Sequence, residues 1–453
     1  MQNRKKVIIV GAGVAGIASA IELAESGIEV HIIESRSFIG GRMYSFQDDS
    51  TGEWLDNGQH IMIGAYENFF RILKTLGTSD LIRCQKKLSV PFIDIDGIKS
   101  NFSSVLFPGM PGLVFGFLRM KEVVFKSRIN AIKLLKKIIV NKIEIADKTV
   151  KNVLKENNQR DDIIKRFWEP LSLAVLNSPP ELVSAKLLTE VLKKATSKGN
   201  FSACLCFPKV PLSELIEPFK SWLELKGGKI LYRTPVDKIL IENHNASVLL
   251  INGEHIEADA IISCVPHHVL IRMLPGNLKN HNIFQALNLF NYSAIISIYL
   301  WLNKEIIQIP FMGMLGTTTQ WIFNKRILCR ADEKAEKEYL PHYALTISGA
   351  YDLTEISSEN IAQKCFSEIK KSFNFSDDLI LLNWKVIKEK RATFIASPEI
   401  ESLRLKSTTP VKNFFLGGDW TDTGLPATLE GAALSGYKAA KKAIEFLNNG
   451  ISS

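Results

Sequence analysis

Residues 6–34 read KVIIVGAGVAGIASAIELAESGIEVHIIE, and their pattern decides the fold class. The apolar run Lys6–Val10 predicts a buried strand, and the apolar residues that recur at helical spacing after Gly16 predict a helix. A second apolar run, Glu29–Ile33, predicts the next strand and leads directly into Glu34. Strand, glycine-rich turn, helix and strand form a βαβ unit, which is how a Rossmann-like domain begins.

The turn has the spacing GxGxxG, with Gly11, Gly13 and Gly16. Gly11 permits the tight turn, Gly13 lets the backbone approach a pyrophosphate, and Gly16 allows close helix packing. The N-terminus of the helix, which includes Ala15, attracts the negative charge, so Ala15 joins the expected contacts. Glu34 follows about 20 residues later, where a carboxylate accepts hydrogen bonds from ribose hydroxyls and repels a 2′-phosphate. The unit therefore predicts binding of FAD or NAD rather than NADP.

The segment FIGGRMYSF at 38–46 follows the acidic residue at once. Gly40 and Gly41 permit a second close backbone approach, and Arg42 supplies a cation for the pyrophosphate or for neighbouring carboxylates. The alternative is an ordinary loop with a glycine pair and a surface arginine. Because of its place after the ribose acid, the segment favours FAD over NAD.

The chain has 453 residues, of which 46% are hydrophobic and 23% charged, so we expect a globular protein with at least two packing units. Its net charge of +9 is scattered, and no nucleic-acid module is recognisable, so we expect no nucleic-acid partner. Residues 119–155 mix basic and apolar side chains, which favours an anionic membrane surface, the alternative being a solvated helix face. No apolar run reaches the ~18 residues of a spanning helix, so any membrane contact would be peripheral.

The six cysteines show no metal-ligand spacing, and we expect no metal site. A reduced, cytoplasmic compartment fits their distribution best. Peripheral association with the cytoplasmic membrane is therefore the expected location.

The C-terminal segment 414–440, FFLGGDWTDTGLPATLEGAALSGYKAA, extends the argument to the other end of the chain. With the two N-terminal motifs it resembles the flavin-containing amine oxidase and phytoene desaturase superfamily. The resemblance implies that Gly418 and Asp419 meet the ribityl and phosphate region of FAD and that Leu429 meets the flavin ring. It also implies that Val236, in GKILYRTPVDKI at 228–239, touches the adenine.

Four sequence segments resemble one group within this superfamily: LDNGQHIMIGAY at 55–66, FWEPLSLAVLNSPPELVSA at 167–185, EKRATF at 389–394 and GDWTDTGLPATLEGA at 418–432. They resemble the squalene-associated FAD-dependent desaturase group, the hydroxysqualene dehydroxylases of hopanoid biosynthesis. The resemblance implies an oxidoreductase that removes the hydroxyl group of hydroxysqualene, an apolar C30 isoprenoid, to give squalene, and it implies an electron donor for the flavin. A carotenoid (phytoene-type) desaturase and a non-catalytic flavin-binding isoprenoid carrier remain alternatives.

Two departures from the amine oxidases fit this placement. Thr428 stands where those enzymes generally carry an aromatic residue of the amine cage. No cysteine follows Cys365, so a C-terminal cysteinyl link is impossible and FAD should be bound noncovalently.

Departure of a hydroxyl group as water needs an acid. Our first candidate is His60, in the segment that in relatives passes beside the flavin, and the others are Asp422 and Asp56. His60 could instead orient the cofactor, and Asp56, before Asn-Gly, could be a turn residue. Trp168, Asn177 and the segment 311–323 could line an apolar tunnel or simply belong to the core.

The resemblance implies an α/β fold in which a Rossmann-like FAD-binding domain of the glutathione-reductase type is interleaved with a mixed α+β substrate domain. We expect the FAD domain to comprise 1–85, 205–275 and 400–453, and the substrate domain 86–204 and 276–399, with a membrane-facing segment near 105–151. Within it, Val105–Leu118 is the candidate route of substrate access, and its two prolines and three glycines predict that it is no simple helix.

Overall fold

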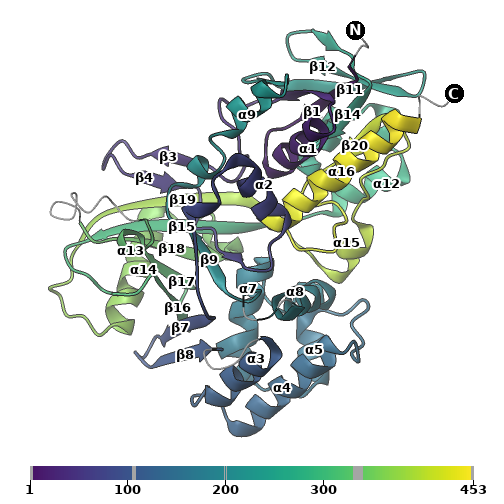
Figure 1. The fold of residues 1–453 in the computed structure, drawn as a ribbon. Coiled ribbons are helices and arrows are strands. Elements are labelled where there is room, and N and C mark those ends of the chain that lie inside the picture. Colours follow the sequence, from purple (N-terminus) through teal and green to yellow (C-terminus); the bar gives the residue numbers. More distant parts are fainter. Residues whose placement is uncertain (1–3, 105–108, 198, 200, 330–339, 450–453) are drawn as a thin grey trace.

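A computed structural model describes residues 4–104, 109–197, 199, 201–329 and 340–449. Figure 1 shows both chain ends at one extremity of the molecule and a group of helices at the other. The fold class predicted from the sequence, an α/β dinucleotide-binding domain joined to a mixed α+β domain, is confirmed.

A five-stranded parallel sheet forms the dinucleotide-binding part. Its strand order is β10 (Lys229–Leu231), β2 (Glu29–Ile33), β1 (Lys6–Val10), β14 (Ala260–Ser263) and β20 (Phe414–Leu416). Three stretches that are far apart in sequence thus share one sheet. Because successive side chains of a strand point to opposite faces, Val7 and Ile9 pack against helices while Ile8 and Val10 face the other side.

Helices cover one face of this sheet and a small β-sheet covers the other. α1 (Val14–Glu25) and α16 (Leu429–Asn449) cross closely, since a Cβ at Gly436 would lie 2.1 Å from the Ala15 carbonyl oxygen. α2 (Asn68–Leu76) and α9 (Phe219–Leu225) pack beside them. The opposite face carries β11 (Val236–Glu242), β12 (Asn245–Leu250) and β13 (His255–Ile256), which contribute Ile239 and Val248 to the core.

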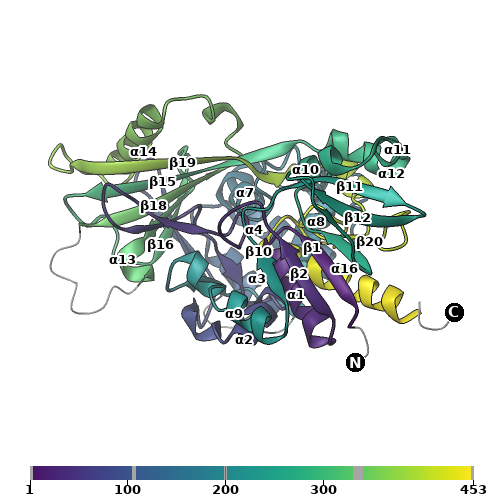
Figure 2. The ribbon, with the colours of Figure 1, turned by 90° about the horizontal axis from the view of Figure 1, so that it is seen from above.

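The second large sheet has seven strands and lies to one side of the first (Figure 2). Its order is β19 (Leu381–Phe394), β15 (Tyr292–Leu302), β18 (His342–Ser348), β17 (Trp321–Asn324), β16 (Phe311–Leu315), β7 (Ser89–Asp94) and β8 (Lys99–Ser103). All neighbours are antiparallel except β16 and β7. α14 (Ser358–Ser372) covers one face, and α13 (Lys325–Leu328) follows β17.

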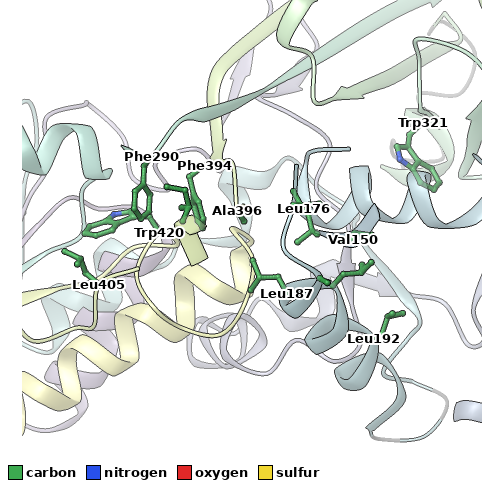
Figure 3. Packing of buried hydrophobic residues seen from close by; sticks show 14 of the residues in the cluster. Val150, Leu176, Leu187, Leu192, Phe290, Trp321, Phe394, Ala396, Leu405 and Trp420 are labelled. Carbon is green, nitrogen blue, oxygen red and sulfur yellow. The ribbon is translucent and has the colours of Figure 1, made fainter. Parts of the chain in front are cut away.

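A helical lobe lies at the end of the molecule opposite the termini (Figure 1). It comprises α3 (Gly109–Arg119), α4 (Phe125–Ile139), α5 (Val150–Glu156), α6 (Asp161–Ile163), the π-helical η2 (Ile164–Trp168), α7 (Glu169–Leu176) and α8 (Ala185–Ser197). Figure 3 shows Val150, Leu187 and Leu192 of this lobe in the same hydrophobic cluster as Phe394 and Trp420. The lobe and the dinucleotide-binding part therefore share a core.

The expectation that Val105–Leu118 is no simple helix is wrong for its described part, because residues from Gly109 onward form α3. Pro111 lies in the first turn of this helix, where no intrahelical donor is lost. Gly116 is where α3 meets the Phe102 ring, which would lie 3.0 Å from an added Cβ. Residues 105–108 lie outside the described residues.

Short elements connect these layers. They are β3 (Ser45–Gln47), β4 (Trp54–Asp56), β5 (Met62–Ile63), η1 (Ser79–Leu81), β6 (Ile82–Cys84), β9 (Leu205–Pro208), η3 (Leu212–Leu215), α10 (His267–Met273), α11 (Gly276–Lys279), α12 (Asn282–Gln285), η4 (Ala286–Leu289), η6 (Tyr351–Leu353) and α15 (Pro398–Leu403). Cys84 and Cys206 face each other across β6 and β9 and form a disulfide, a pairing that the cysteine spacing did not indicate. Among the described residues, no helix is long and apolar enough to cross a membrane.

Candidate functional site

A cavity of about 880 Å³ runs from the glycine-rich turn after β1 to the helical lobe. One part of its wall is formed by the turn, by the segment around Gly40 and by the loop that precedes α16. The other part is formed by apolar side chains of the helical lobe and the seven-stranded sheet. A cofactor and an apolar substrate can thus share one continuous space.

The two glycine motifs pack directly against each other. Gly13 and Gly40 form an isolated parallel bridge, and a Cβ at Gly41 would lie 3.2 Å from the Gly13 Cα. Gly11 has a positive φ of +99°, and a Cβ at Gly16 would lie 2.0 Å from the Gly11 carbonyl oxygen. Bare backbone therefore faces the cavity where side chains would fill it, which is the surface that a pyrophosphate needs.

Glu34 is 7% exposed and lines the cavity. Its two carboxylate oxygens accept hydrogen bonds from the backbone N–H groups of Ala12 and Arg36, both at 2.8 Å. These bonds fix the carboxylate at the end of β2, where the sequence places a ribose contact. Oε1 also accepts from the Ser35 hydroxyl at 3.2 Å, whereas Oε2 keeps a further lone pair for such a contact.

Arg42 and Asp419 join the two ends of the chain. Their guanidinium and carboxylate groups form an ion pair of 2.7 Å, and Arg42 also donates to the Ala392 carbonyl oxygen. Burial disfavours the charge on Arg42, but the Asp419 carboxylate outweighs burial and raises the pKa of the guanidinium. Both residues line the cavity. The N-terminal and C-terminal motifs thus meet at one charged contact.

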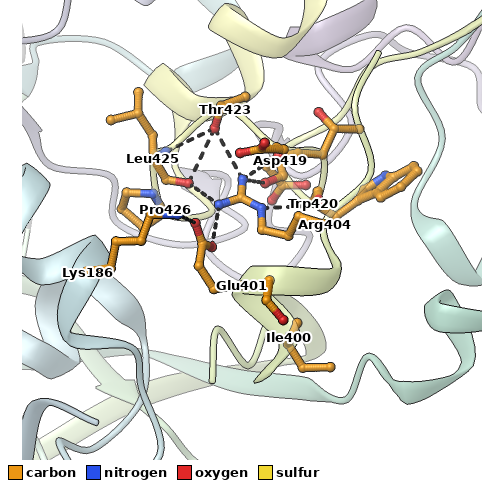
Figure 4. Close-up of polar contacts among 12 residues, drawn as sticks. Lys186, Ile400, Glu401, Arg404, Asp419, Trp420, Thr423, Leu425 and Pro426 are labelled. Atoms are coloured by element: carbon orange, nitrogen blue, oxygen red, sulfur yellow. Dashed lines mark hydrogen bonds and ion pairs between the residues drawn. The ribbon is translucent and has the colours of Figure 1, made fainter. Parts of the chain in front are cut away.

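A buried arginine that sequence reasoning missed holds the C-terminal loop (Figure 4). The Arg404 guanidinium, whose side chain is 0% exposed, pairs with Glu401 at 2.9 Å. It also donates to four backbone carbonyls and one hydroxyl of the loop before α16, those of Asp419, Trp420, Thr421, Leu425 and Thr423. Nothing in the local sequence shows that Arg404 is buried, because the loop acceptors that surround it lie 15 or more residues later.

Of the three candidate acids, His60 lines the cavity, whereas Asp56 and Asp422 are not part of its lining. Burial lowers the pKa of His60, the Asp56 carboxylate opposes this shift, and Arg42 adds to it. The imidazole is therefore mostly neutral at pH 7. Asp56 is engaged elsewhere, with Lys325 at 3.1 Å and Ser45 at 2.7 Å from its carboxylate oxygens.

The expected cofactor contacts mostly gather on the cavity wall. Those that line it are Gly11, Gly13, Ala15, Glu34, Gly40, Gly41, Arg42, Val236, Gly418, Asp419 and Leu429. Gly16 lies just behind the wall, where α1 meets the turn. Among the expected tunnel residues, Asn177, Trp321 and Phe323 line the cavity, while Trp168 is packed in the core and donates to Gln159.

A second group of cavity residues also escaped the sequence reasoning. The Tyr292 hydroxyl lies between Nδ1 of His267, at 3.2 Å, and Nδ1 of His268. Burial is the main cause that lowers the pKa of both histidines to about 4 and raises that of Tyr292 to about 12. The paired histidines in VPHH after β14 were the available signal, but their partner comes from β15.

The sequence pattern of the family "Flavin containing amine oxidoreductase" matches residues 14–444. The chain belongs to this family. As a flavin-containing amine oxidoreductase it is an FAD-dependent oxidoreductase, and the predicted cofactor is FAD. The bare backbone at Gly11, Gly13, Gly40 and Gly41, which we call the glycine cradle, fits the phosphates of that cofactor. The fixed Glu34 and the Arg42–Asp419 pair fit its riboses and phosphates.

Relatives that match nearly the whole chain confirm its resemblance to the hydroxysqualene dehydroxylases. A hydroxysqualene dehydroxylase of Sinorhizobium fredii is 28% identical over 448 residues, which cover 98% of this chain and 99% of the relative. One from Zymomonas mobilis is 26% identical and covers 96% and 98%. A 15-cis-phytoene desaturase of Synechococcus elongatus is also 26% identical and covers 97% and 96%.

Solved structures agree on the fold. An oxidoreductase from Methanosarcina mazei has a TM-score of 0.74 at 18% identity and covers 97% of this chain and 100% of its own. A putrescine oxidase has a TM-score of 0.73 at 14% identity and covers 98% and 99%.

Proposed function

We propose that this flavin-containing amine oxidoreductase removes the hydroxyl group of hydroxysqualene to give squalene, in the synthesis of hopanoid-type triterpenoids. The observation that carries the proposal is the continuity of the cavity. The glycine cradle and an apolar tunnel, lined by Leu113, Phe117, Leu171 and Leu192 among others, belong to one space. A C30 isoprenoid needs such a tunnel, and the full-length relatives named hydroxysqualene dehydroxylase support this substrate.

The reaction exchanges a carbon–oxygen bond for a carbon–hydrogen bond and releases water, so it consumes one hydride and one proton. Reduced FAD supplies the hydride when it is bound, and a separate electron donor must reduce it again. The protein orients the linear isoprenoid and provides the proton. Its apolar tunnel keeps water away from the reacting carbon.

We assign the proton donor to His60 in preference to Asp422 and Asp56, because His60 alone of the three lines the cavity. Its lowered pKa means that the protonated fraction grows as the pH falls below about 6.5. Turnover by the wild type should therefore rise toward acid pH. His60→Gln should lose about 10²-fold or more in kcat, keep its flavin spectrum and lose the rise. An unchanged pH profile in His60→Gln would move the role to another group, and Asp422→Asn and Asp56→Asn are the next variants.

The proposed cofactor ligands are the residues named above around Gly11, Glu34, Gly40, Val236 and Asp419. We further propose that 1–85, 205–275 and 400–453 act as one discontinuous FAD domain, with 86–204 and 276–399 as the substrate domain. FAD titration of Gly13→Val and Asp419→Ala, against the wild type, tests both ends of this arrangement.

A carotenoid-type desaturase is the second candidate, and the phytoene desaturase relatives favour it. It would remove hydrogen with oxidised flavin. Purified holoenzyme given hydroxysqualene with a flavin reductant, and separately phytoene with an electron acceptor, separates the two. Conversion of phytoene alone would replace the proposal, and binding of either compound without turnover would indicate a carrier.

We also propose that the enzyme takes its substrate from an anionic membrane surface, on the cytoplasmic side, through the turn between α3 and α4. Leu118, Val124 and Phe125 are 40%, 52% and 63% exposed there. The exposed cations Arg119, Lys121 and Lys126 flank them, which complements anionic headgroups.

Side-chain hydrogen bonds hold this turn, and its two helices contribute Leu113, Phe117 and Leu135 to the tunnel wall. Arg128 donates to the carbonyl oxygens of Leu118, Lys121 and Val123. The Asp162 carboxylate accepts from the Val124 N–H at 2.9 Å and from Ser127 Oγ at 2.8 Å. An apolar tip held in this way can insert into a leaflet without an ordering cost on binding.

Sedimentation with phosphatidylglycerol vesicles tests this surface. Because a buried phenylalanine contributes about 1.5–3 kcal/mol, Phe125→Asn should weaken binding by about 10- to 100-fold. Leu225→Asn, at a site 87% exposed in the dinucleotide-binding part, is the matched control and should bind like the wild type. Equal binding by all three proteins would remove this turn from the proposal.

A further inference from the structure

The loop between β4 and β5 carries a glutamine whose orientation is fixed from outside the loop. Asn57, Gly58, Gln59 and His60 all line the cavity. Lys325, from the start of α13 beyond the seven-stranded sheet, donates from Nζ to the Gln59 Oε1 at 3.3 Å and to the Asp56 Oδ2 at 3.1 Å. The amide of Gln59 thus lies between a buried cation and the cavity.

The lysine is held in its charged form. Lys325 is 7% exposed and Asp56 2% exposed. Burial disfavours the ammonium charge, but the Asp56 carboxylate outweighs it and raises the pKa of Lys325. The other Asp56 oxygen, Oδ1, accepts from Ser45 Oγ at 2.7 Å and from the Leu212 N–H at 3.0 Å, which fixes the carboxylate in turn.

This charge decides which way the amide points. An ammonium group has three donors and no acceptor, so only the amide oxygen of Gln59 can face it. The Nε2 group, with its two N–H donors, is therefore turned away from Lys325. Within the part of the chain that the structure describes, no acceptor is hydrogen-bonded to Nε2.

We propose that Gln59 binds the hydroxyl oxygen of the substrate through Nε2 and that Lys325 is the residue that positions it. This inference rests on the proposed function, because it needs a substrate that carries a hydroxyl group. An amide donor in a largely apolar cavity gains most from an acceptor that arrives with the ligand. Gln59 thereby selects the alcohol over the hydrocarbon product, which offers no acceptor.

The test compares the affinities of oxidised holoenzyme for hydroxysqualene and squalene, read from the change in flavin absorbance. Gln59→Glu is the sharpest variant, because it keeps an oxygen for Lys325 but replaces the amide donors by an acceptor. Gln59→Met removes the polar group altogether. Both should bind hydroxysqualene about fivefold more weakly and squalene as the wild type does, since one neutral hydrogen bond contributes about 1 kcal/mol.

Two further variants separate positioning from folding. Lys325→Met, together with Asp56→Asn to avoid an unpaired buried carboxylate, should lower the preference for the alcohol while Gln59 remains in place. Gln47→Met, at an exposed site on β3, is the control and should change neither affinity.

The outcomes are distinct. Wild-type holoenzyme that binds neither compound, or that converts only phytoene, overturns the proposed function and this inference with it. Wild-type enzyme that binds and converts hydroxysqualene, with the same alcohol preference in Gln59→Glu and Gln59→Met, overturns this inference alone. Parallel loss of both affinities in these two variants would show a structural role and would also overturn it.

Discussion

Arg404→Met removes the buried cation that holds the loop between β20 and α16. The native guanidinium satisfies Glu401, four carbonyl oxygens and the Thr423 hydroxyl, and its side chain is 0% exposed. Methionine fills similar space but leaves the 3% exposed Glu401 carboxylate with Lys186, at 3.5 Å, as its one cationic partner among the described residues. Removing one partner of a buried ion pair costs about 3–5 kcal/mol.

Two measurements follow from this magnitude. The melting temperature of apoprotein should fall by about 3–5 °C, since a chain of this length has an unfolding entropy of about 1 kcal/mol per degree. FAD binding should weaken by about 5- to 30-fold, because the loosened loop that carries Asp419 must be ordered again at a cost of about 1–2 kcal/mol. Differential scanning fluorimetry and quenching of FAD fluorescence give the two values.

Matched variants keep the test strict. Glu401→Gln combined with Arg404→Met removes the unpaired charge and should recover part of the melting temperature but little of the FAD affinity. Lys406→Met, an exposed change two residues away, should alter neither value. Wild-type stability and FAD affinity in Arg404→Met would refute the reasoning that this arginine organises the C-terminal half of the cofactor site.

Three further outcomes are expected. Gly16→Ala should abolish flavin absorbance after reconstitution with FAD, because its Cβ would lie 2.0 Å from the Gly11 carbonyl oxygen. Wild-type flavin absorbance in this variant would contradict the role of the glycine turn in FAD binding. Since the pKa of His267 is about 4 in the fold, its contribution to stability is complete above the ordinary value of 6.5 and is lost as the pH falls toward 4. His267→Gln should therefore remove about 3 kcal/mol of the acid sensitivity seen in melting curves between these pH values. Thiol titration of denatured protein without reductant should find four thiols, and six after reduction, because Cys84 and Cys206 are bonded, whereas six thiols at the outset would exclude the bond.

Periodicity and glycine spacing, which are local, were enough to predict the dinucleotide-binding start of the chain. Residues 6–34 specify β1, α1 and β2 because the spacing of their apolar residues changes from that of a strand to that of a helix and back. The glycines between β1 and α1 mark the tight turn that joins them. The resemblance of the C-terminal segment predicted that Asp419 and Leu429 meet the same cofactor, and both residues line the same cavity as Gly11 and Gly13. His60 belongs to the segment 55–66, which in relatives passes beside the flavin, and this histidine does line the cavity.

Contacts between segments that are far apart in the chain could not be predicted from the sequence. Arg404, Lys325 and the Tyr292 hydroxyl have their partners on other elements, and no local pattern marks a side chain as buried among them. The same holds for α3, where the prolines and glycines of the sequence suggested irregular chain and tertiary packing against Phe102 favours a helix. Sequence determined the elements and the cofactor motifs, because those follow from residues close together in the chain. Tertiary structure decided which polar groups face the cavity and which are held behind it, because burial and charge pairing exist only once the chain has folded.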